Sequence, residues 1–333
     1  MNRFFTFAWL VLALSGANRS FAEDSLAEAI REAVTKISSR LVRIDTIGGY
    51  DRIDGEPANE GATTGLLMDA GGHILTSSFN FLHEPSTILV RRHDGVRKVA
   101  KIVATDSSRK LTLLQAEMTS DGITPLESPS APKIGQYVVA VGRALSMDEP
   151  NVSLGILSGE NRIWGKAIQT DAKISPNNYG GPLVNLQGEI LGLCVPLSAM
   201  SDETNAGAEM YDAGVGTAIP AADMLESFER LKNGQDLKAG VLGVAFNELM
   251  LFTGPAIIDA IAKNSPAEKA GLQKGDRIVR IDDAAVGSAM EATVKFRRKY
   301  AGDAVKITMV RGDIPDETTF EMTMVSHEEM TGR

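Results

Sequence analysis

The sequence holds a single cysteine, so no disulfide can form within the chain. This residue, Cys194, lies in the apolar run Ile190–Val195, and we interpret it as a buried structural thiol. Histidine is also scarce, and the four histidines are scattered: His73, His83, His93 and His327. Because no Cys/His pair has the spacing of a zinc site, we expect neither a bound metal nor another cofactor.

Basic residues are outnumbered, with 34 lysines and arginines against 43 acidic residues and a net charge of -9. Residues 1–22 hold Arg3, Arg19 and no acidic residue. The chain without them has 32 basic residues against 43 acidic ones, a net charge of -11. Because an acidic surface repels phosphates, this charge disfavours nucleic acid as a partner.

The chain also lacks an obvious membrane span at its N-terminus. Arg3 precedes the largely apolar run Phe4–Leu14, which is shorter than the ~20 residues that a spanning helix needs. Ser20–Ala22 supplies small residues at a cleavage site. We therefore predict a signal peptide over residues 1–22 and export to the periplasm or cell envelope. The alternative is an uncleaved segment that anchors the protein to the membrane.

The remaining chain is long enough for two domains. Over Ser25–Lys36 apolar residues recur at every fourth position, which predicts an amphipathic helix. Many short strands separated by turn residues follow, and this rhythm is typical of an all-β barrel or sandwich. The clearest predicted strands are Leu41–Ile44, Ile88–Val90, Tyr137–Val141 and Ala167–Gln169.

A boundary follows this β region. A helix is predicted from Pro220 to Leu231, with Asn233 and Gly234 as its C-terminal stop. We assign residues 23–234 to the first domain, 235–239 to a linker, 240–326 to a second domain and 327–333 to a polar tail.

One loop carries most of the functional information. Residues Ile174–Leu183 read Ile-Ser-Pro-Asn-Asn-Tyr-Gly-Gly-Pro-Leu and follow Gln-Thr-Asp-Ala at residues 169–172. This loop resembles the nucleophile loop of the HtrA/DegP family of trypsin-like, PDZ-bearing serine proteases. Gly155–Gly159 and Gly214–Pro220 match two further segments of that family in the same order. The resemblance implies an all-β chymotrypsin-like double β-barrel, followed by a small α+β PDZ domain.

The resemblance also locates the catalytic positions, and all three are altered. Tyr179 stands where the family has the nucleophilic serine, Phe79 where it has histidine and Lys110 where it has aspartate. Asn177 replaces a glycine of the oxyanion loop. A triad needs a base that takes the proton of the nucleophile and a carboxylate that orients the base. Phe79 can do neither, so we expect no intact catalytic residue.

The second domain resembles a bacterial PDZ domain over Ser265–Ile281, and no second copy is present. PDZ domains bind a peptide as an added strand and hold its terminal carboxylate with backbone N–H groups of a glycine-rich loop. The residues expected to form this loop are Gly240, Val241, Leu242, Gly243 and Val244. The alternative is that they only begin a core strand.

We therefore expect a pseudoprotease that binds C-termini or extended segments of exported proteins as a scaffold, chaperone-like or regulatory subunit. The family's trimers imply a homotrimer, or a mixed oligomer with an active paralogue. The rival hypothesis is a residual endopeptidase, or another hydrolase, that uses Tyr179 and Lys110. An enzyme needs an open cleft at Tyr179, whereas the binding hypothesis predicts a cleft filled by aromatic side chains.

Overall fold

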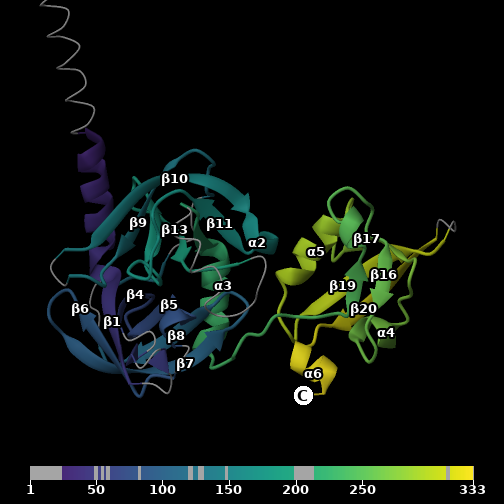
Figure 1. Cartoon of the computed structure of the whole chain (residues 1–333), viewed down its shortest axis with the longest axis horizontal. Helices are drawn as coiled ribbons and strands as arrows, with labels where there is room; N and C mark the ends of the chain where they lie inside the picture. Colours follow the sequence, from purple (N-terminus) through teal and green to yellow (C-terminus); the bar gives the residue numbers. More distant parts are fainter. Residues whose placement is uncertain are drawn as a thin grey trace, which may run out of the picture.

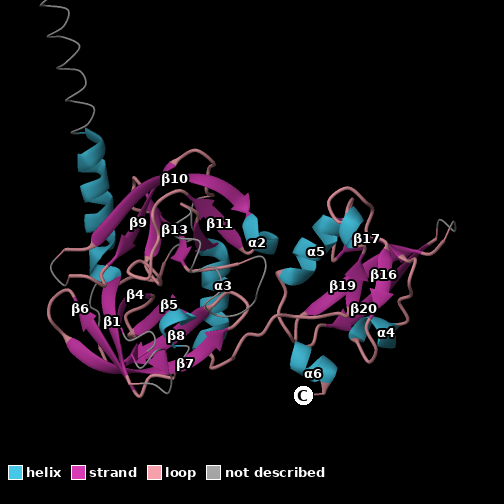
Figure 2. Ribbon diagram, viewed as in Figure 1, coloured by secondary structure: helices cyan, strands magenta, loops and turns pink. Residues whose placement is uncertain are grey.

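The computed structural model describes residues 25–48, 52–53, 56–57, 61–81, 84–118, 123–126, 131–146, 149–198, 214–312 and 316–332. The predicted signal peptide and His83 lie outside these residues. The described chain forms a larger lobe of two β-barrels and a smaller α+β lobe (Figure 1). Strands make up most of the larger lobe (Figure 2). Within these ranges, none of the helices is both long and apolar enough to cross a membrane.

The first barrel closes through six antiparallel strands. Around the barrel they are β1 (Leu41–Ile47), β4 (Gly61–Leu67), β5 (His73–Ser77), β8 (Leu111–Ala116), β7 (Arg97–Asp106) and β6 (Thr87–Arg92). Alternate side chains of these strands point inward, because successive residues of a strand face opposite sides. Val42 and Ile44 of β1 thus join Val90 of β6 in one buried cluster. A short hairpin, β2 (Arg52–Ile53) with β3 (Glu56–Pro57), follows β1.

The second barrel repeats this architecture. Its strands are β10 (Asn151–Asn161), β11 (Ala167–Thr170), β14 (Gly216–Pro220), β13 (Ile190–Cys194), β12 (Pro182–Asn185) and β9 (Tyr137–Gly142). The expected double β-barrel and the four predicted strands are confirmed. Cys194 is fully buried, as expected, and burial raises the pKa of its thiol to about 12, which disfavours the reactive thiolate.

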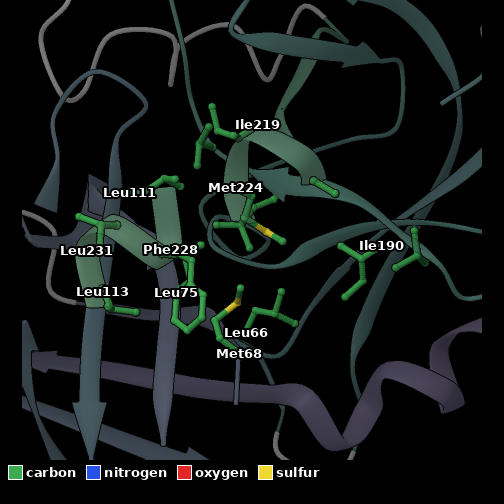
Figure 3. Close-up of a cluster of buried hydrophobic side chains, with 14 of the residues drawn as sticks. Leu66, Met68, Leu75, Leu111, Leu113, Ile190, Ile219, Met224, Phe228 and Leu231 are labelled. Atoms are coloured by element: carbon green, nitrogen blue, oxygen red, sulfur yellow. The ribbon is translucent and has the colours of Figure 1, made fainter. Parts of the chain in front are cut away.

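Two helices cover the junction of the barrels. The predicted N-terminal helix spans residues 25–37 and buries Val34 and Ile37 in the central core. Helix α3 (Ala221–Lys232) is the predicted boundary helix, and it buries Met224, Phe228 and Leu231. Figure 3 shows these α3 side chains among residues of both barrels, so one apolar core joins the barrels.

The smaller lobe has the elements of a PDZ domain. Its strands are β15 (Val244–Phe246), β16 (Ile258–Ile261), β17 (Arg277–Ile281), β18 (Ala284–Ala285), β19 (Ala304–Val310) and β20 (Glu317–Thr323). Its helices are α4 (Pro266–Ala270), α5 (Ala289–Arg297) and α6 (His327–Thr331). The motif recognised in the sequence builds α4: the Ser265 side chain caps its first turn, and Gly271 ends it with φ 89°.

The aspartate of that motif, Asp276, has a structural role. Burial opposes its ionisation, but hydrogen bonds from Arg311 and from the N–H of Gln273 outweigh burial and lower its pKa. The Arg311 guanidinium contacts both carboxylate oxygens, at 2.7 and 2.8 Å. The carboxylate therefore joins the turn before β17 to the end of β19.

This ion pair should make the stability of the PDZ lobe sensitive to acid. The folded pKa of Asp276 lies below its unfolded value of about 4, so the stabilisation is present above that pH and is lost as the pH falls through the folded pKa. We expect Asp276→Asn to cost about 1–2 kcal/mol at pH 7 and less below pH 4. Urea unfolding across pH 3–7 measures this, and an equal cost at every pH would contradict it.

The predicted linker and the predicted polar tail, at the two ends of the second domain, both form ordered structure. The predicted polar tail forms helix α6, whose capping box pairs Ser326 with Glu329. In the predicted linker Leu237 is buried and extends the first barrel, because its N–H donates to Thr105 O at 2.8 Å. Tyr300 of the PDZ lobe is 1% exposed and belongs to the core of the barrels. The two lobes are therefore packed together.

Candidate functional sites

The loop before β12 is held tightly between the barrels. Its glycines permit this, because a Cβ on Gly180, where φ is 77°, would lie 2.2 Å from Thr64 O. A Cβ on Gly181 would lie 2.0 Å from Val141 O. These contacts explain why the loop needs two consecutive glycines and place Tyr179 at the barrel junction.

The structure brings Tyr179 and Phe79 together. Phe79 lies in the 3-10 turn Ser78–Phe81 that follows β5. The two rings meet edge to face, with centroids 5.1 Å apart and an interplanar angle of 73°. Tyr179 is only 2% exposed and packs in the core of the second barrel. The two positions where a nucleophile and a base are expected are thus occupied by packed aromatic rings.

Lys110, the third position, adjoins this pair through the backbone. Its carbonyl accepts a hydrogen bond of 2.8 Å from the N–H of Ser78. The residue has φ 57° and is 4% exposed. The Phe79 and Tyr179 rings are thus in contact, and the backbone of Lys110 lies beside Ser78, the residue before Phe79.

Hydrogen bonds between backbone groups of the nucleophile loop close it into a turn. An oxyanion hole needs N–H groups that point at the position of the substrate oxygen. Here the N–H of Tyr179 donates to Ser175 O at 3.2 Å and to Pro176 O at 3.3 Å. Asn177 does not have a positive φ, and its carbonyl accepts from the Thr64 hydroxyl at 3.0 Å. Asn177, which stands where the family has a glycine, thus lies in a turn that internal hydrogen bonds close.

Sequence analysis missed a histidine–carboxylate pair elsewhere in the first barrel. His73 Nδ1 lies 2.9 Å from Asp69, and Lys232 Nζ lies 2.8 Å from the same carboxylate. Burial opposes ionisation of Asp69, but these two partners outweigh it and lower its pKa. His73 begins β5, whereas Phe79 follows the end of that strand. The pair therefore cannot replace the base beside Tyr179. No cluster suited to a metal occurs in the described residues.

A second candidate site is a groove of about 660 Å³ on the PDZ lobe. All five residues predicted to bind peptide line it: Gly240, Val241, Leu242, Gly243 and Val244. Its other walls include α5 and residues that sequence analysis did not identify: Trp164, Lys166 and His327. Among the described residues, the N–H groups of Leu242 and Gly243 donate to no protein oxygen, so they are available to a ligand.

Family models match both lobes. A trypsin-like peptidase domain matches residues 63–193, and a PDZ domain matches residues 240–322. The chain is a homologue of the DegP/HtrA serine endoproteases. This confirms the family expected from the nucleophile loop. The names of several relatives include the word periplasmic, in agreement with the expected export.

The relatives of this HtrA homologue are moderately similar. A probable periplasmic serine endoprotease of Hahella chejuensis is 32% identical over 268 residues, which cover 76% of this chain and 55% of that protein. A DegP-like protein of Marinomonas sp. is also 32% identical and is covered to 56%. The chain thus spans about half the length of these curated relatives. The HtrA-type protease AlgW with a tripeptide shares the fold, with TM-score 0.68, 23% identity and coverage of 89% and 96%.

Proposed function

We propose that this HtrA homologue is a catalytically inactive pseudoprotease that binds peptide segments of exported proteins through its PDZ groove. One observation carries the first half of this proposal: the buried Tyr179 ring packs against Phe79 where a nucleophile and its base would act. A phenol that is 2% exposed is poorly placed to attack a peptide bond. Phe79 has no atom that can accept a proton.

The closed nucleophile loop supports the same conclusion. A tetrahedral intermediate needs N–H groups that are free to bind its oxyanion. The N–H of Tyr179 is instead occupied by the carbonyls of Ser175 and Pro176. The rival hydrolase that uses Tyr179 and Lys110 requires an accessible hydroxyl, and the burial of both residues argues against it.

The PDZ groove supports the binding half of the proposal. Strand β15 pairs with β16 on one edge, and its residues also line the groove. A peptide can add to the other edge as a further strand. The N–H groups of Leu242 and Gly243 would then hold its terminal carboxylate. Gly243 has φ 82°, and a Cβ there would lie 2.2 Å from Ser265 Cβ, so glycine is required in this loop.

This chemistry fits a scaffold, a chaperone-like protein or a regulatory subunit in the periplasm. The proposed ligands are exposed C-termini or extended segments of envelope proteins. Self-association, or assembly with an active paralogue, follows by analogy with the family and belongs to the proposal.

A peptide-binding assay tests the groove. We expect peptides with a free C-terminus and an apolar last residue to bind the chain, and their C-terminal amides to bind about tenfold more weakly or worse. Gly243→Ala should abolish binding because it distorts the loop. Gly302→Ala is a matched control, since Gly302 also has a positive φ but lies outside the groove, with no atom near an added Cβ. Equal binding of acids and amides would contradict recognition of C-termini.

A further inference from the structure

The C-terminal helix α6 contributes a side chain to the PDZ groove. Its first residue, His327, lines the groove together with Ala239 and Gly240, which lead into the glycine-rich loop. The chain just before α6 pairs with this loop, because Val241 and Val325 each donate to the carbonyl of the other, at 2.8 and 3.2 Å. The groove therefore includes a residue of the segment that sequence analysis assigned to a polar tail.

His327 lies at the end of the groove where a peptide would place its C-terminus. The N–H groups of Leu242 and Gly243 are the proposed contacts of the terminal carboxylate, and β15 follows them in the chain. A peptide that ends there runs antiparallel to β15, with its carboxylate nearest to the residues before the loop. The bridge between Val241 and Val325 is also antiparallel, so the chain after it runs back beside those same residues.

Contacts away from the groove hold α6 in place. The capping box of Ser326 and Glu329 fixes its first turn, and Ser326 is buried. Lys238, which precedes the groove residues, forms an ion pair with Glu328. Lys238, Glu328 and Glu329 line a separate depression that does not include His327. The helix thus presents His327 to the groove while its acidic side chains lie elsewhere.

The other charged side chains of the groove are engaged or distant. Lys166 Nζ donates to Ser108 O at 3.2 Å, and the Arg297 guanidinium lies over a tryptophan ring, 5.0 Å from its centroid. Glu248 begins the 3-10 turn after β15, at the opposite end of the groove. Among the described residues, the His327 imidazole has no hydrogen-bond or ion-pair partner. It is therefore the basic group that is available to a carboxylate.

An imidazole is also the group that can change its charge between pH 8 and pH 5.5. The other charged groups of the groove and around α6 are Lys166, Glu248, Arg297, Asp236, Lys238, Glu328 and Glu329. Lysine, arginine and carboxylate side chains ordinarily keep their charge over this range, and the terminal carboxylate of a peptide, with a pKa of about 3.5, stays ionised. Acidification therefore adds a positive charge beside the ligand without removing the negative charge of the ligand.

We infer that His327 is a specificity-determining residue whose protonated imidazole pairs with the terminal carboxylate of the bound peptide. The groove then binds free C-termini more tightly as the pH falls from 8 to 5.5. The backbone N–H groups of the loop orient the carboxylate, and the charge of His327 sets how strongly it is held. This inference rests on the proposed peptide binding and adds a dependence on pH that backbone groups cannot supply.

Peptide binding at the two ends of this pH range tests the inference. The probe is a peptide with a label on its N-terminus, a free apolar C-terminal residue and no titratable side chain. Its fluorescence anisotropy is followed with the chain that starts at residue 23. We expect wild type to bind it about fivefold more tightly at pH 5.5 than at pH 8. The C-terminal amide of the same peptide should lack this dependence.

Two substitutions separate the charge of His327 from its shape. His327→Gln is neutral at every pH and should bind at both values as weakly as wild type does at pH 8. His327→Lys is charged throughout and should bind at both values about as tightly as wild type does at pH 5.5. His93→Gln is the matched control, because His93 is an exposed histidine in the turn between β6 and β7, and this variant should keep the pH dependence of wild type.

Two kinds of result would overturn the inference in distinguishable ways. If peptides bind but wild type shows no pH dependence, or if His327→Gln or the peptide amide retains it, His327 does not recognise the carboxylate, while the proposed function stands. If no peptide binds wild type at either pH, the proposed function fails and the inference fails with it.

Discussion

The wild-type chain should leave casein uncleaved, and the variant Phe79→His, Lys110→Asp, Tyr179→Ser, Asn177→Gly should cleave it. The physical reason is that the fold already places Phe79 and Tyr179 side by side, whereas Phe79 cannot accept a proton and Tyr179 is buried. Loss of a triad member lowers turnover by about 10⁴-fold or more, so the difference should exceed the background of the assay. Labelling with an active-site serine probe gives an independent measurement.

The fourth substitution, Asn177→Gly, is included to change the backbone conformation of the nucleophile loop. The turn that contains Asn177 uses the N–H of Tyr179 internally. Glycine at 177 gives the loop the freedom to present its N–H groups to a substrate. The variant that restores the other residues but keeps Tyr179 is the matched control and should stay inactive. Cleavage by wild type that disappears in Tyr179→Phe would contradict the pseudoprotease proposal and identify Tyr179 as a nucleophile.

Tyr300→Ala should destabilise the chain by about 4 kcal/mol. Removal of a fully buried aromatic ring leaves a cavity and costs about 3–5 kcal/mol. The Asp106 carboxylate would also lose a donor in a site with no exposure to water. Because Tyr300 lies in the core that joins both barrels, the loss should appear in the unfolding of the larger lobe as well as in that of the PDZ lobe.

Guanidinium unfolding measures this effect. Tyr137→Ala is the matched control, since Tyr137 is 49% exposed, and its free energy of unfolding should change by less than about 0.5 kcal/mol. If Tyr300→Ala costs less than about 1 kcal/mol, the tyrosine does not contribute to the core of the barrels. The lobes would then be joined mainly by the linker.

The large elements could be predicted from the sequence because local patterns determine them. The recurrence of apolar residues at every fourth position over Ser25–Lys36 indicated a helix, and short apolar runs between turn residues indicated strands. The consecutive glycines at 180 and 181 belong to the loop Ile174–Leu183, which carried much of the family resemblance. Their close approaches to Thr64 O and Val141 O supply the physical reason, since no larger residue fits there.

The candidate catalytic site could be predicted only in part. The resemblance assigned Phe79, Lys110 and Tyr179 to the three catalytic positions. In the structure the rings of Phe79 and Tyr179 are in contact, and the Lys110 carbonyl accepts a hydrogen bond from Ser78, next to Phe79. Their packing could not be read from the sequence, because whether Tyr179 points into solvent or into the core depends on contacts with remote strands. The internal hydrogen bonds of the nucleophile loop could not be predicted from the sequence either.

The sequence by itself determined the two domains and their family and predicted the glycine-rich loop that we propose binds peptide, because each depends on residues that are close together in the chain. Only the tertiary structure decided that Trp164 reaches the PDZ groove and that Tyr300 enters the core of the barrels. Both contacts join segments more than seventy residues apart, and no local pattern encodes them. They depend on the hydrogen bonds of the buried Tyr300 hydroxyl with Asp106 and Ser227, and on the packing of α2 (Arg162–Gly165) against α5.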